Sequence, residues 1–544
     1  MAGGLMQLVA YGAQDVYLTA NPQITFWKVT YRRYTNFAME SIEQTFNGAA
    51  DFGRRVQCTL SRNGDLAYRT YLEVTLPEIK NESTSHHMYA RWLDYPGEQL
   101  IDQVEVEIGG QRIDRQYGQW MHIWNQLTMT KEQEAGYNKM VGHTTALTYL
   151  TDPSYADIDT PCAADGKTQV CEPRKALPAT TLYVPLQFWF CRNPGLALPL
   201  IALQYHEVKI NITFNKIEKC LWAGSKTFAS KEDVSFTKYT KAYQNSLLHA
   251  SLFVDYIFLD TDERRRMAQN PHEYLIEQLQ FTGEESVGSS SNKIKLNFNH
   301  PCKELVWVAQ KDELVDECNM FDATDDAGSE VKDMFGCQYF NYTDAIDVLP
   351  KLVAGYGSVD RVLSSGPPTL AGEMGGDFGN GNEATTLFSG DLANTDTGAG
   401  VGQEVESNNG DGTNKYTDAA QYVVSETSRS LNCWGTNPVV SAKLQLNGQD
   451  RFSDREGSYF DTVQPYQHHT RHPDTGINVY SFALRPEEHQ PSGTCNFSRI
   501  DNATLQLSLS YNMVKDSTAK VRVYAVNYNV LRIMSGMGGL AYSN

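Results

Sequence analysis

The most regular feature of the sequence is a set of short runs in which apolar and polar residues alternate. Examples are YLEVTL (71–76), VKINITF (208–214) and VRVYAV (521–526), each bounded by turn residues. Alternation with a period of two is typical of strands that bury one face. Helical spacing is found in few places, mainly QWMHIWNQL (119–127) and the charged DERRRMAQ (262–269). The pattern therefore predicts an all-β protein with few short helices.

The two halves of the chain resemble each other. Four pairs of similar segments occur in the same order: SIEQTFNG (41–48) with LIEQLQFTG (275–283), IGGQRIDRQYG (108–118) with LNGQDRFSDREG (446–457), EVKINITF (207–214) with NATLQLSL (502–509), and IFLDTDERRRM (257–267) with YAVNYNVLRIM (524–534). Each match alone is weak, but four matches in one order predict an internal duplication. The join is expected near residues 260–272.

Each half contains about eight strand segments with long connections, which is the pattern of a Greek-key jelly roll. The predicted strands are 40–47, 54–61, 68–76, 101–108, 181–190, 198–204, 207–214 and 250–260 in the first half, and 273–281, 292–298, 304–309, 440–447, 476–484, 494–499, 503–511 and 521–531 in the second. We therefore expect two tandem eight-stranded jelly rolls, a double jelly roll. The first spans 31–268, the second spans 269–544, and an N-terminal arm at 1–30 precedes them.

The negative charge is concentrated in one segment. The chain carries 46 Lys and Arg against 65 Asp and Glu, a net charge of −19, and residues 311–430 alone hold 22 acidic and 6 basic residues. Within that segment, 355–412 contains 14 glycines, so it can bury little apolar surface. We expect an exposed loop insertion at about 310–436, between strands D and E of the second jelly roll; a disordered linker is the alternative. Its charge repels phosphate, so we expect no direct contact with nucleic acid.

The rest of the composition argues against several classes of protein. No apolar run approaches the roughly 18 residues of a spanning helix, and the N-terminus, MAGGLMQLVAYGAQD, lacks the features of a signal peptide. The 10 cysteines include no CxxC pair, so reduced thiols are expected rather than a zinc or redox motif. Cys162 and Cys171 bracket one loop and would pair only if oxidised.

The segment RPEEHQPSGTCNFSR (485–499) contains the parts of a thiol nucleophile. Glu487 and Glu488 lie beside His489, and Cys495 follows. A thiol site needs the histidine to be held against the thiol by a third group, and nothing in this spacing ensures that. The prolines and the glycine of the segment are turn residues. We therefore interpret it as a structural loop between strands F and G and predict no catalytic residue.

Two further motifs suggest metal sites only weakly. HHTRH (468–472) has a spacing that could ligate a metal on a helix, but neighbouring prolines indicate a loop. DATDDAGSE (322–330) lacks the residue order of a calcium-binding loop. We predict neither a metal site nor a cofactor site.

Four longer segments carry a family resemblance: NPQITFWKVTYRRYTNFA (21–38), DYIFLDTDERRRMAQNPHEYLIEQLQF (255–281), RPEEHQPSGTCNFSRIDNATLQLSL (485–509) and NYNVLRIMSGMGGLAYSN (527–544). They resemble the major capsid protein of nucleocytoplasmic large DNA viruses, above all of those that infect algae and protists. The resemblance covers both termini and the join between the halves. It implies a double jelly-roll structural protein of the virion, with no enzymatic activity and no cofactor.

The same resemblance implies homotrimers that act as pseudo-hexagonal capsomers and tile an icosahedral shell. Neighbouring capsomers, penton proteins and minor capsid proteins would be the partners, and the inner membrane layer would be reached only indirectly. Assembly would occur in the host cytoplasm, with the N-terminal arm at the inner face of the capsid. Two other classes are disfavoured. A secreted carbohydrate enzyme or lectin would need a signal peptide and paired carboxylates, whereas a minor capsid or penton protein would need only one jelly roll.

Five N-x-S/T sequons occur, at Asn81, Asn211, Asn341, Asn496 and Asn502. Asn211 and Asn502 fall in or beside predicted strands. Because the resemblance implies that some relatives carry glycans on outer loops, Asn341 is the candidate for glycosylation. The basic run DERRRM (262–267) is interpreted as a solvated linker between the halves, and a contact with an acidic neighbour is the alternative.

Overall fold

The first jelly roll is built from two antiparallel sheets. One has the order β1-β13-β3-β10, with β9 also paired to β3, and the other has the order β2-β11-β6-β7. The strands are β1 (Phe37–Gln44), β2 (Arg55–Thr59), β3 (Leu66–Leu76), β6 (Ile101–Ile108), β7 (Gln111–Tyr117), β9 (Thr180–Pro185), β10 (Leu198–Pro199), β11 (Val208–Phe214) and β13 (His249–Leu259). The computed structural model describes residues 3–80, 88–148, 176–225, 242–315, 339–344, 436–514 and 518–542.

The second jelly roll repeats this topology. Its sheets have the orders β14-β22-β16-β19, with β20 and β23 paired to β16 and β22, and β15-β21-β17-β18. The strands are β14 (His272–Val287), β15 (Ser291–Lys295), β16 (Pro301–Lys311), β17 (Val439–Leu446), β18 (Gln449–Glu456), β19 (Asn478–Ser481), β20 (Cys495–Asn496), β21 (Ala503–Leu509), β22 (Ala519–Met534) and β23 (Met537–Leu540). Two small sheets pair β4 (Ile79–Lys80) with β8 (Ala176–Leu177) and β5 (Met88–Trp92) with β12 (Leu221–Ser225).

The helices are short and lie between the strands or before them. They are α1 (Gly3–Val9), α2 (Val16–Thr19), α3 (Pro96–Leu100), α4 (Gly118–Thr128), α5 (Lys131–Val141), α6 (Thr145–Thr148), α7 (Trp189–Arg192), α9 (Thr261–Gln269), α10 (Asp312–Val315), α17 (Gln464–His468) and α18 (Tyr511–Val514), with single turns at η2 (Pro194–Leu196), η3 (Ile217–Lys219), η4 (Ala242–Gln244), η10 (Tyr459–Val463) and η11 (Phe497–Arg499). Within the described ranges, none of them has the length and apolar character that crossing a membrane requires.

Two-residue turns explain why glycine recurs at matching places in the two halves. Residues 109–110 connect β6 to β7 and residues 447–448 connect β17 to β18. Gly109 and Gly110 have φ values of 58° and 85°, and Asn447 and Gly448 have values of 51° and 81°. A type I′ hairpin turn needs positive φ at both central positions, which favours Gly and Asn. The IGGQ and LNGQ segments of the repeat are therefore hairpin turns.

The double jelly roll predicted from the sequence is confirmed. Every predicted strand range overlaps an observed strand, and the two predicted helical segments correspond to α4 and α9. The predicted strand 181–190 is too long, because the chain turns into α7 after Pro185. β18 has no alternation that would predict it, because nearly all of its side chains are exposed.

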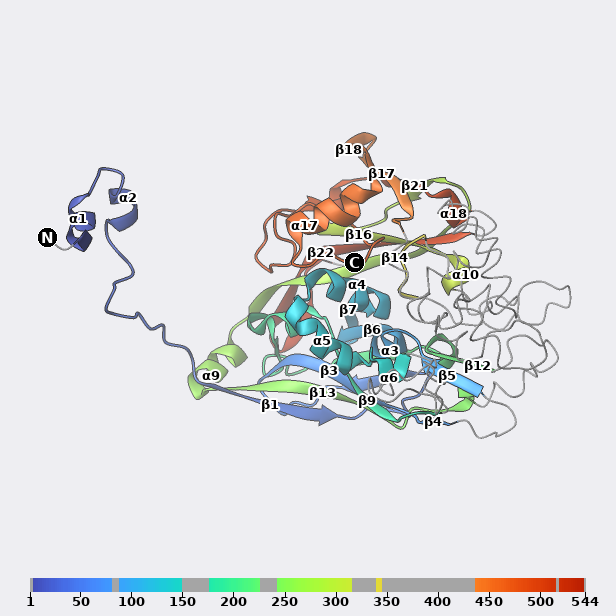
Figure 1. The fold of residues 1–544 in the computed structure, drawn as a ribbon. Coiled ribbons are helices and arrows are strands. Elements are labelled where there is room, and N and C mark those ends of the chain that lie inside the picture. Colours follow the sequence, from blue (N-terminus) through green and yellow to red (C-terminus); the bar gives the residue numbers. More distant parts are fainter. Residues whose placement is uncertain are drawn as a thin grey trace, which may run out of the picture.

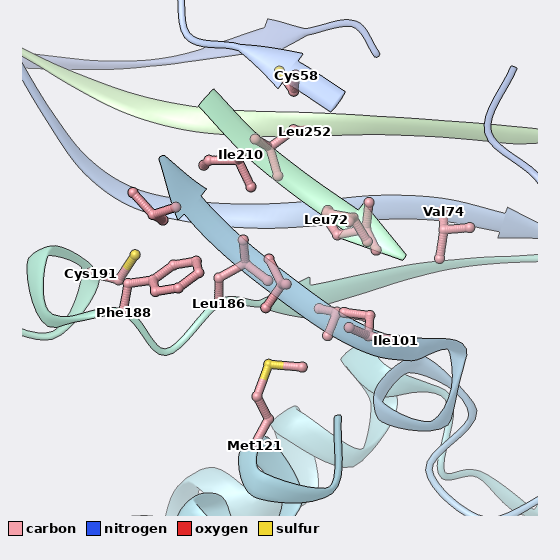
Figure 2. Close-up of a cluster of buried hydrophobic side chains, with 14 of the residues drawn as sticks. Cys58, Leu72, Val74, Ile101, Met121, Leu186, Phe188, Cys191, Ile210 and Leu252 are labelled. Atoms are coloured by element: carbon pink, nitrogen blue, oxygen red, sulfur yellow. The ribbon is translucent and has the colours of Figure 1, made fainter. Parts of the chain in front are cut away.

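Each jelly roll has an apolar core, and the first core also includes three residues of the second jelly roll, Ile276, Leu531 and Ile533. In the first, Leu72 and Leu252 come from one sheet and Ile210 from the other, and all three are fully buried. Figure 2 shows these side chains in one cluster, with Met121 of α4 beside it. In the second, Trp307 is a fully buried member of the corresponding cluster. Burial of a large apolar side chain stabilises a fold by about 1.5–3 kcal/mol, so these clusters hold each pair of sheets together.

The two jelly rolls are joined through α4, which lies between them together with β7 (Figure 1). We call the contact of α4 with the second jelly roll the joint. On α4 it contains Trp120, Ile123, Trp124 and Leu127, and on the second jelly roll it contains Val306, Val308, Val479, Tyr524 and Val526. The backbone N–H of Leu279 also donates to Asp114 Oδ1 across the two halves, at 3.1 Å. The buried apolar surface fixes how one jelly roll is oriented on the other.

Candidate functional site

The opposite face of α4 is tied to the first jelly roll by a buried polar network. Glu98 of α3 is fully buried, and its Oε2 lies 2.7 Å from His122 Nδ1. Its Oε1 accepts hydrogen bonds from Asn125 at 2.9 Å and from the hydroxyl of Tyr137. A buried carboxylate has to keep its hydrogen-bond donors, so the network fixes the positions of the side chains that take part in it. α4 is therefore held to its own jelly roll while its apolar face contacts the other.

A cluster of charged side chains connects the two jelly rolls beside the joint. Glu277 of β14 is 4% exposed, and its carboxylate lies 2.8 Å from Lys303 Nζ, 2.9 Å from the guanidinium of Arg192 and 3.5 Å from His489 Nδ1. Arg192 belongs to the first jelly roll and the other three residues to the second. Burial alone would raise the pKa of Glu277, but Arg192, His489 and Lys303 lower it to about 2. The carboxylate is therefore ionised at neutral pH and bridges the two units.

The segment 485–499 lies against this cluster. Lys303 Nζ donates to the carbonyl oxygen of Glu488 at 3.3 Å, and the Tyr528 hydroxyl donates to that of His489 at 3.2 Å. Lys303 Nζ also lies 5.1 Å from the centre of the Tyr528 ring. Two strands of the sheet thus fix the loop through its backbone, as a structural loop requires.

Cys495 does not have the environment of a thiol nucleophile. It lies on β20, across from Cys302 of β16. Burial raises its pKa, whereas a reactive thiol needs a lowered pKa. The partner that the structure gives His489 is Glu277. The Cys495 thiol and the His489 imidazole therefore have different neighbours and do not form a catalytic pair.

The HHTRH segment forms ion pairs within the second jelly roll through His469. The side chain of His469 is fully buried, with Nε2 3.0 Å from Glu304 Oε2 and Nδ1 3.0 Å from Glu487 Oε1. Burial alone would lower the pKa of His469, but Glu304 and Glu487 raise it to about 9. The ring is thus a cation at neutral pH, which has no free lone pair for a metal. His468 and His472 contact backbone carbonyl groups. Across the described ranges, no group of three or more His, Cys, Asp or Glu side chains could hold a metal ion.

The charged residues beside the joint were not identified by motif. Lys303 and Glu304 stand together in strand β16, directly before its apolar run 305–309, and are both fully buried. Ionisable residues are rarely buried unless they are paired. Glu304 at the start of the predicted strand 304–309, with Lys303 directly before it, is the signal that could have revealed them. Their partners, such as Arg192 and His469, are too distant in sequence for spacing to identify.

The N-terminal arm has a different character from the rest of the chain. Its helices α1 and α2 contain no buried residue, and Phe26 and Trp27 are 101% and 85% exposed. The arm extends away from both jelly rolls (Figure 1). Monomeric proteins rarely expose so many large apolar side chains together. The arm is therefore suited to contact something outside this chain.

Comparison with known protein families accounts for both halves of the chain. Residues 25–260 match the family model described as major capsid protein N-terminus. Residues 263–539 match the model described as large eukaryotic DNA virus major capsid protein. The chain belongs to this capsid protein family. The family consists of structural major capsid proteins and is not enzymatic, and a major capsid protein belongs to the capsid of the virion.

Individual relatives agree over the full length. This capsid protein is 68% identical to the major capsid protein of Phaeocystis pouchetii virus and 63% identical to that of Chrysochromulina ericina virus, with 100% of each chain covered. It is similar to the crystal structure of PBCV-1 VP54 fitted into a reconstruction of the virophage Sputnik, with a TM-score of 0.60 at 34% identity, covering 96% of this chain and 100% of that one. The Faustovirus major capsid protein shares the fold, with a TM-score of 0.59 at 12% identity, covering 98% and 96%. The resemblance stated from the sequence is thereby confirmed.

The structure also bears on the sequons and the basic run. Asn341 is 4% exposed, and its Oδ1 accepts hydrogen bonds from the backbone N–H and the hydroxyl of Thr343. The glycan at Asn341 stays a prediction, and this burial argues against it, because a glycan needs a solvent-exposed amide. Asn211 is buried, whereas Asn496 and Asn502 are exposed.

Several predictions concern other parts of the chain. Asn81, Cys162, Cys171 and the segment 322–330 lie outside the described residues. The basic run forms the exposed helix α9, in which Arg264 lies 3.0 Å from Asp65. α9 is therefore a solvated connection between the halves that also makes one contact with an acidic side chain.

Proposed function

We propose that this capsid protein forms homotrimers, and that each trimer is a pseudo-hexagonal capsomer of an icosahedral shell. A hexagonal lattice position has six neighbours, whereas three identical chains have only threefold symmetry. Two jelly rolls of the same topology in each chain supply six similar units. The observation that carries the proposal is the joint, because a buried helix and a charged cluster hold the two units at one fixed angle.

The test is the mass of the purified protein in solution. Light scattering at micromolar concentration should report three chains per particle, because a capsomer needs an interface on the order of 2,000 Å² or more. A stable monomer under these conditions would contradict the proposal.

We further propose three parts for the chain: an arm at 1–30, a first jelly roll at 31–268 and a second at 269–544. The arm faces the capsid interior and the acidic insertion at about 310–436 faces outwards. In support, α10, which leads into the insertion, lies at the opposite end of the molecule from α9 and the start of the arm (Figure 1). Most of the insertion lies outside the described residues.

The proposed partners follow from this arrangement. They are neighbouring capsomers, penton proteins and minor capsid proteins, with the inner membrane layer reached indirectly and no direct contact with nucleic acid. Assembly takes place in the host cytoplasm, and the protein catalyses no reaction.

Deletion of residues 2–24 tests the role of the arm. The two arm helices, α1 and α2, bury no side chain, so the truncated protein should keep the melting temperature of the full chain. It should nevertheless fail in shell assembly. A truncated protein that does not fold would mean that the arm belongs to the core.

A further inference from the structure

The helix that forms the joint has a counterpart in the second jelly roll. α4 follows the hairpin β6–β7, and the helical residues 457–468 follow the hairpin β17–β18. Both helices begin at a glycine. A Cβ atom on Gly118 would lie 2.2 Å from the carbonyl oxygen of Ile101, and one on Gly457 would lie 1.7 Å from that of Val439. Ile101 and Val439 begin the equivalent strands β6 and β17, so each helix docks on its own jelly roll in the same way.

Alignment at the two glycines matches the faces of the helices position by position. The face that points into its own jelly roll is buried in both copies: Met121, His122 and Asn125 in α4 match Phe460, Asp461 and Gln464. Met121 belongs to the first core and Phe460 to the second. The two helices are therefore equivalent in orientation as well as in place.

The other face differs sharply between the copies. In α4 this face is Trp120, Ile123, Trp124 and Leu127, all buried in the joint. The matching residues are Tyr459, Thr462, Val463 and Tyr466. Tyr466 is 86% exposed and Val463 is 38% exposed. Tyr459 packs partly against the second core, but at Thr462, Val463 and Tyr466 the surface that makes the joint in the first copy is uncovered in the second.

The surface that such a helix would contact is partly exposed to solvent in the first jelly roll. α4 packs on the outer face of β16, β22 and β19, whose equivalents in the first jelly roll are β3, β13 and β9. Leu72 and Leu252 point into the core, so Tyr71, Phe253 and Tyr183 point outwards, because side chains alternate along a strand. The ring centroids of Tyr71 and Phe253 are 5.3 Å apart, and those of Tyr71 and Tyr183 are 6.1 Å apart. We call these three residues the aromatic row.

We propose that the exposed face of helix 457–468 packs on the aromatic row of a second copy of this chain. The contact between chains repeats the geometry of the joint within the chain. Three joints and three such contacts alternate around a ring of six jelly rolls and close it, so no free face of this kind is left. The inference rests on the proposed trimer and names the surfaces that form it.

The first experiment places a charge on the exposed face of the full chain. Tyr466→Glu should raise the concentration at which trimers dissociate at least tenfold, measured by light scattering on a dilution series. Tyr466 is 86% exposed, so the change should not disturb the fold. The circular dichroism spectrum and the melting temperature of the isolated variant subunit should therefore match those of the unchanged subunit. Tyr511→Glu, at a tyrosine that is 71% exposed elsewhere, is the matched control and should leave dissociation unchanged.

The second experiment tests whether the two surfaces meet. Tyr183→Arg should weaken trimers as Tyr466→Glu does, and the two changes together should recover at least part of the loss, because opposite charges then face each other. A photo-reactive phenylalanine analogue at position 466 should cross-link to strands β3, β9 or β13 of another chain. Trimers unaffected by Tyr466→Glu, or cross-links only to other segments, would overturn the inference. A monomeric unchanged chain would instead contradict the proposed trimer itself.

Discussion

The charged cluster at Glu277 offers the sharpest test of how the two jelly rolls are held together. Glu277→Gln keeps the size of the side chain and removes its charge. The pKa of Glu277 is lowered from 4.5 to about 2, which corresponds to about 3 kcal/mol at roughly 1.4 kcal/mol per factor of ten. Lys303, which is fully buried, also loses its charged partner. Loss of one partner of a buried ion pair costs about 3–5 kcal/mol. Both routes give a loss of about 3 kcal/mol or more in the free energy of unfolding at pH 7.

The pH dependence has a definite sign. A carboxyl group whose pKa is lowered by folding stabilises the protein above its unfolded pKa, here 4.5, and loses that contribution as the pH falls towards 2. Urea unfolding at pH 7 and at pH 3 should therefore separate the two proteins. The difference between Glu277→Gln and the unchanged chain should be large at pH 7 and smaller at pH 3.

A matched control lies on the same strand. Glu273 pairs with Arg532 at 2.9 Å, but both side chains are about half exposed, at 55% and 51%. An exposed pair of this kind contributes about 0–1 kcal/mol, so Glu273→Gln should change the urea midpoint little. If Glu277→Gln were no more destabilising than Glu273→Gln at pH 7, the cluster would not be holding the two jelly rolls together.

Three further outcomes are expected. The cation at His469, whose pKa is raised from 6.5 to about 9, should stabilise the fold fully below pH 6.5 and lose its effect as the pH rises through about 9; melting between pH 6 and 10 should show this decline, and His469→Gln should flatten it. Substitution of both His489 and Cys495 by Ala should leave assembly nearly intact, and the loss of a measurable hydrolytic activity would contradict a purely structural role. A broad-specificity protease should cut assembled particles first within the glycine-rich 355–412 and leave trimers intact; early cutting at 1–30 instead would mean that the capsomer is oriented the other way.

Most strands could be predicted from the sequence, because a half-buried strand shows apolar and polar residues in alternation. β3 is predicted by YLEVTL, whose alternate side chains Leu72 and Val74 are fully buried. β18 escapes prediction because it is an exposed edge strand, with Phe452 as its one buried side chain. Turn chemistry was visible as well, since Gly110 and Gly448 mark equivalent hairpins. Local sequence pattern therefore predicts the features that depend on a single strand or a single turn.

The joint could not be found in that way, because it depends on which surfaces meet. α4 is predicted as a helix, but its spacing does not show that Ile123 is covered by residues of the second jelly roll. The HHTRH segment suggested a metal until the structure placed Glu304 and Glu487 on either side of His469. The same histidine in the same local sequence can serve either role, and only its distant partners decide between them.

The matched helices show why a duplicated chain has to diverge at equivalent surfaces. At the joint the first copy has Trp120, Ile123, Trp124 and Leu127, which are covered once the chain has folded. At the same positions the second copy has smaller or more polar side chains, among them Thr462 and Tyr466. In the single chain Val463 and Tyr466 face water, so a patch as apolar as that of α4 would promote aggregation of the free subunit. Tyrosine keeps a large contact area while its hydroxyl remains hydrated. The face that is covered within one chain can therefore be permanently apolar, whereas a face that is covered only in the proposed trimer has to remain soluble in the free subunit.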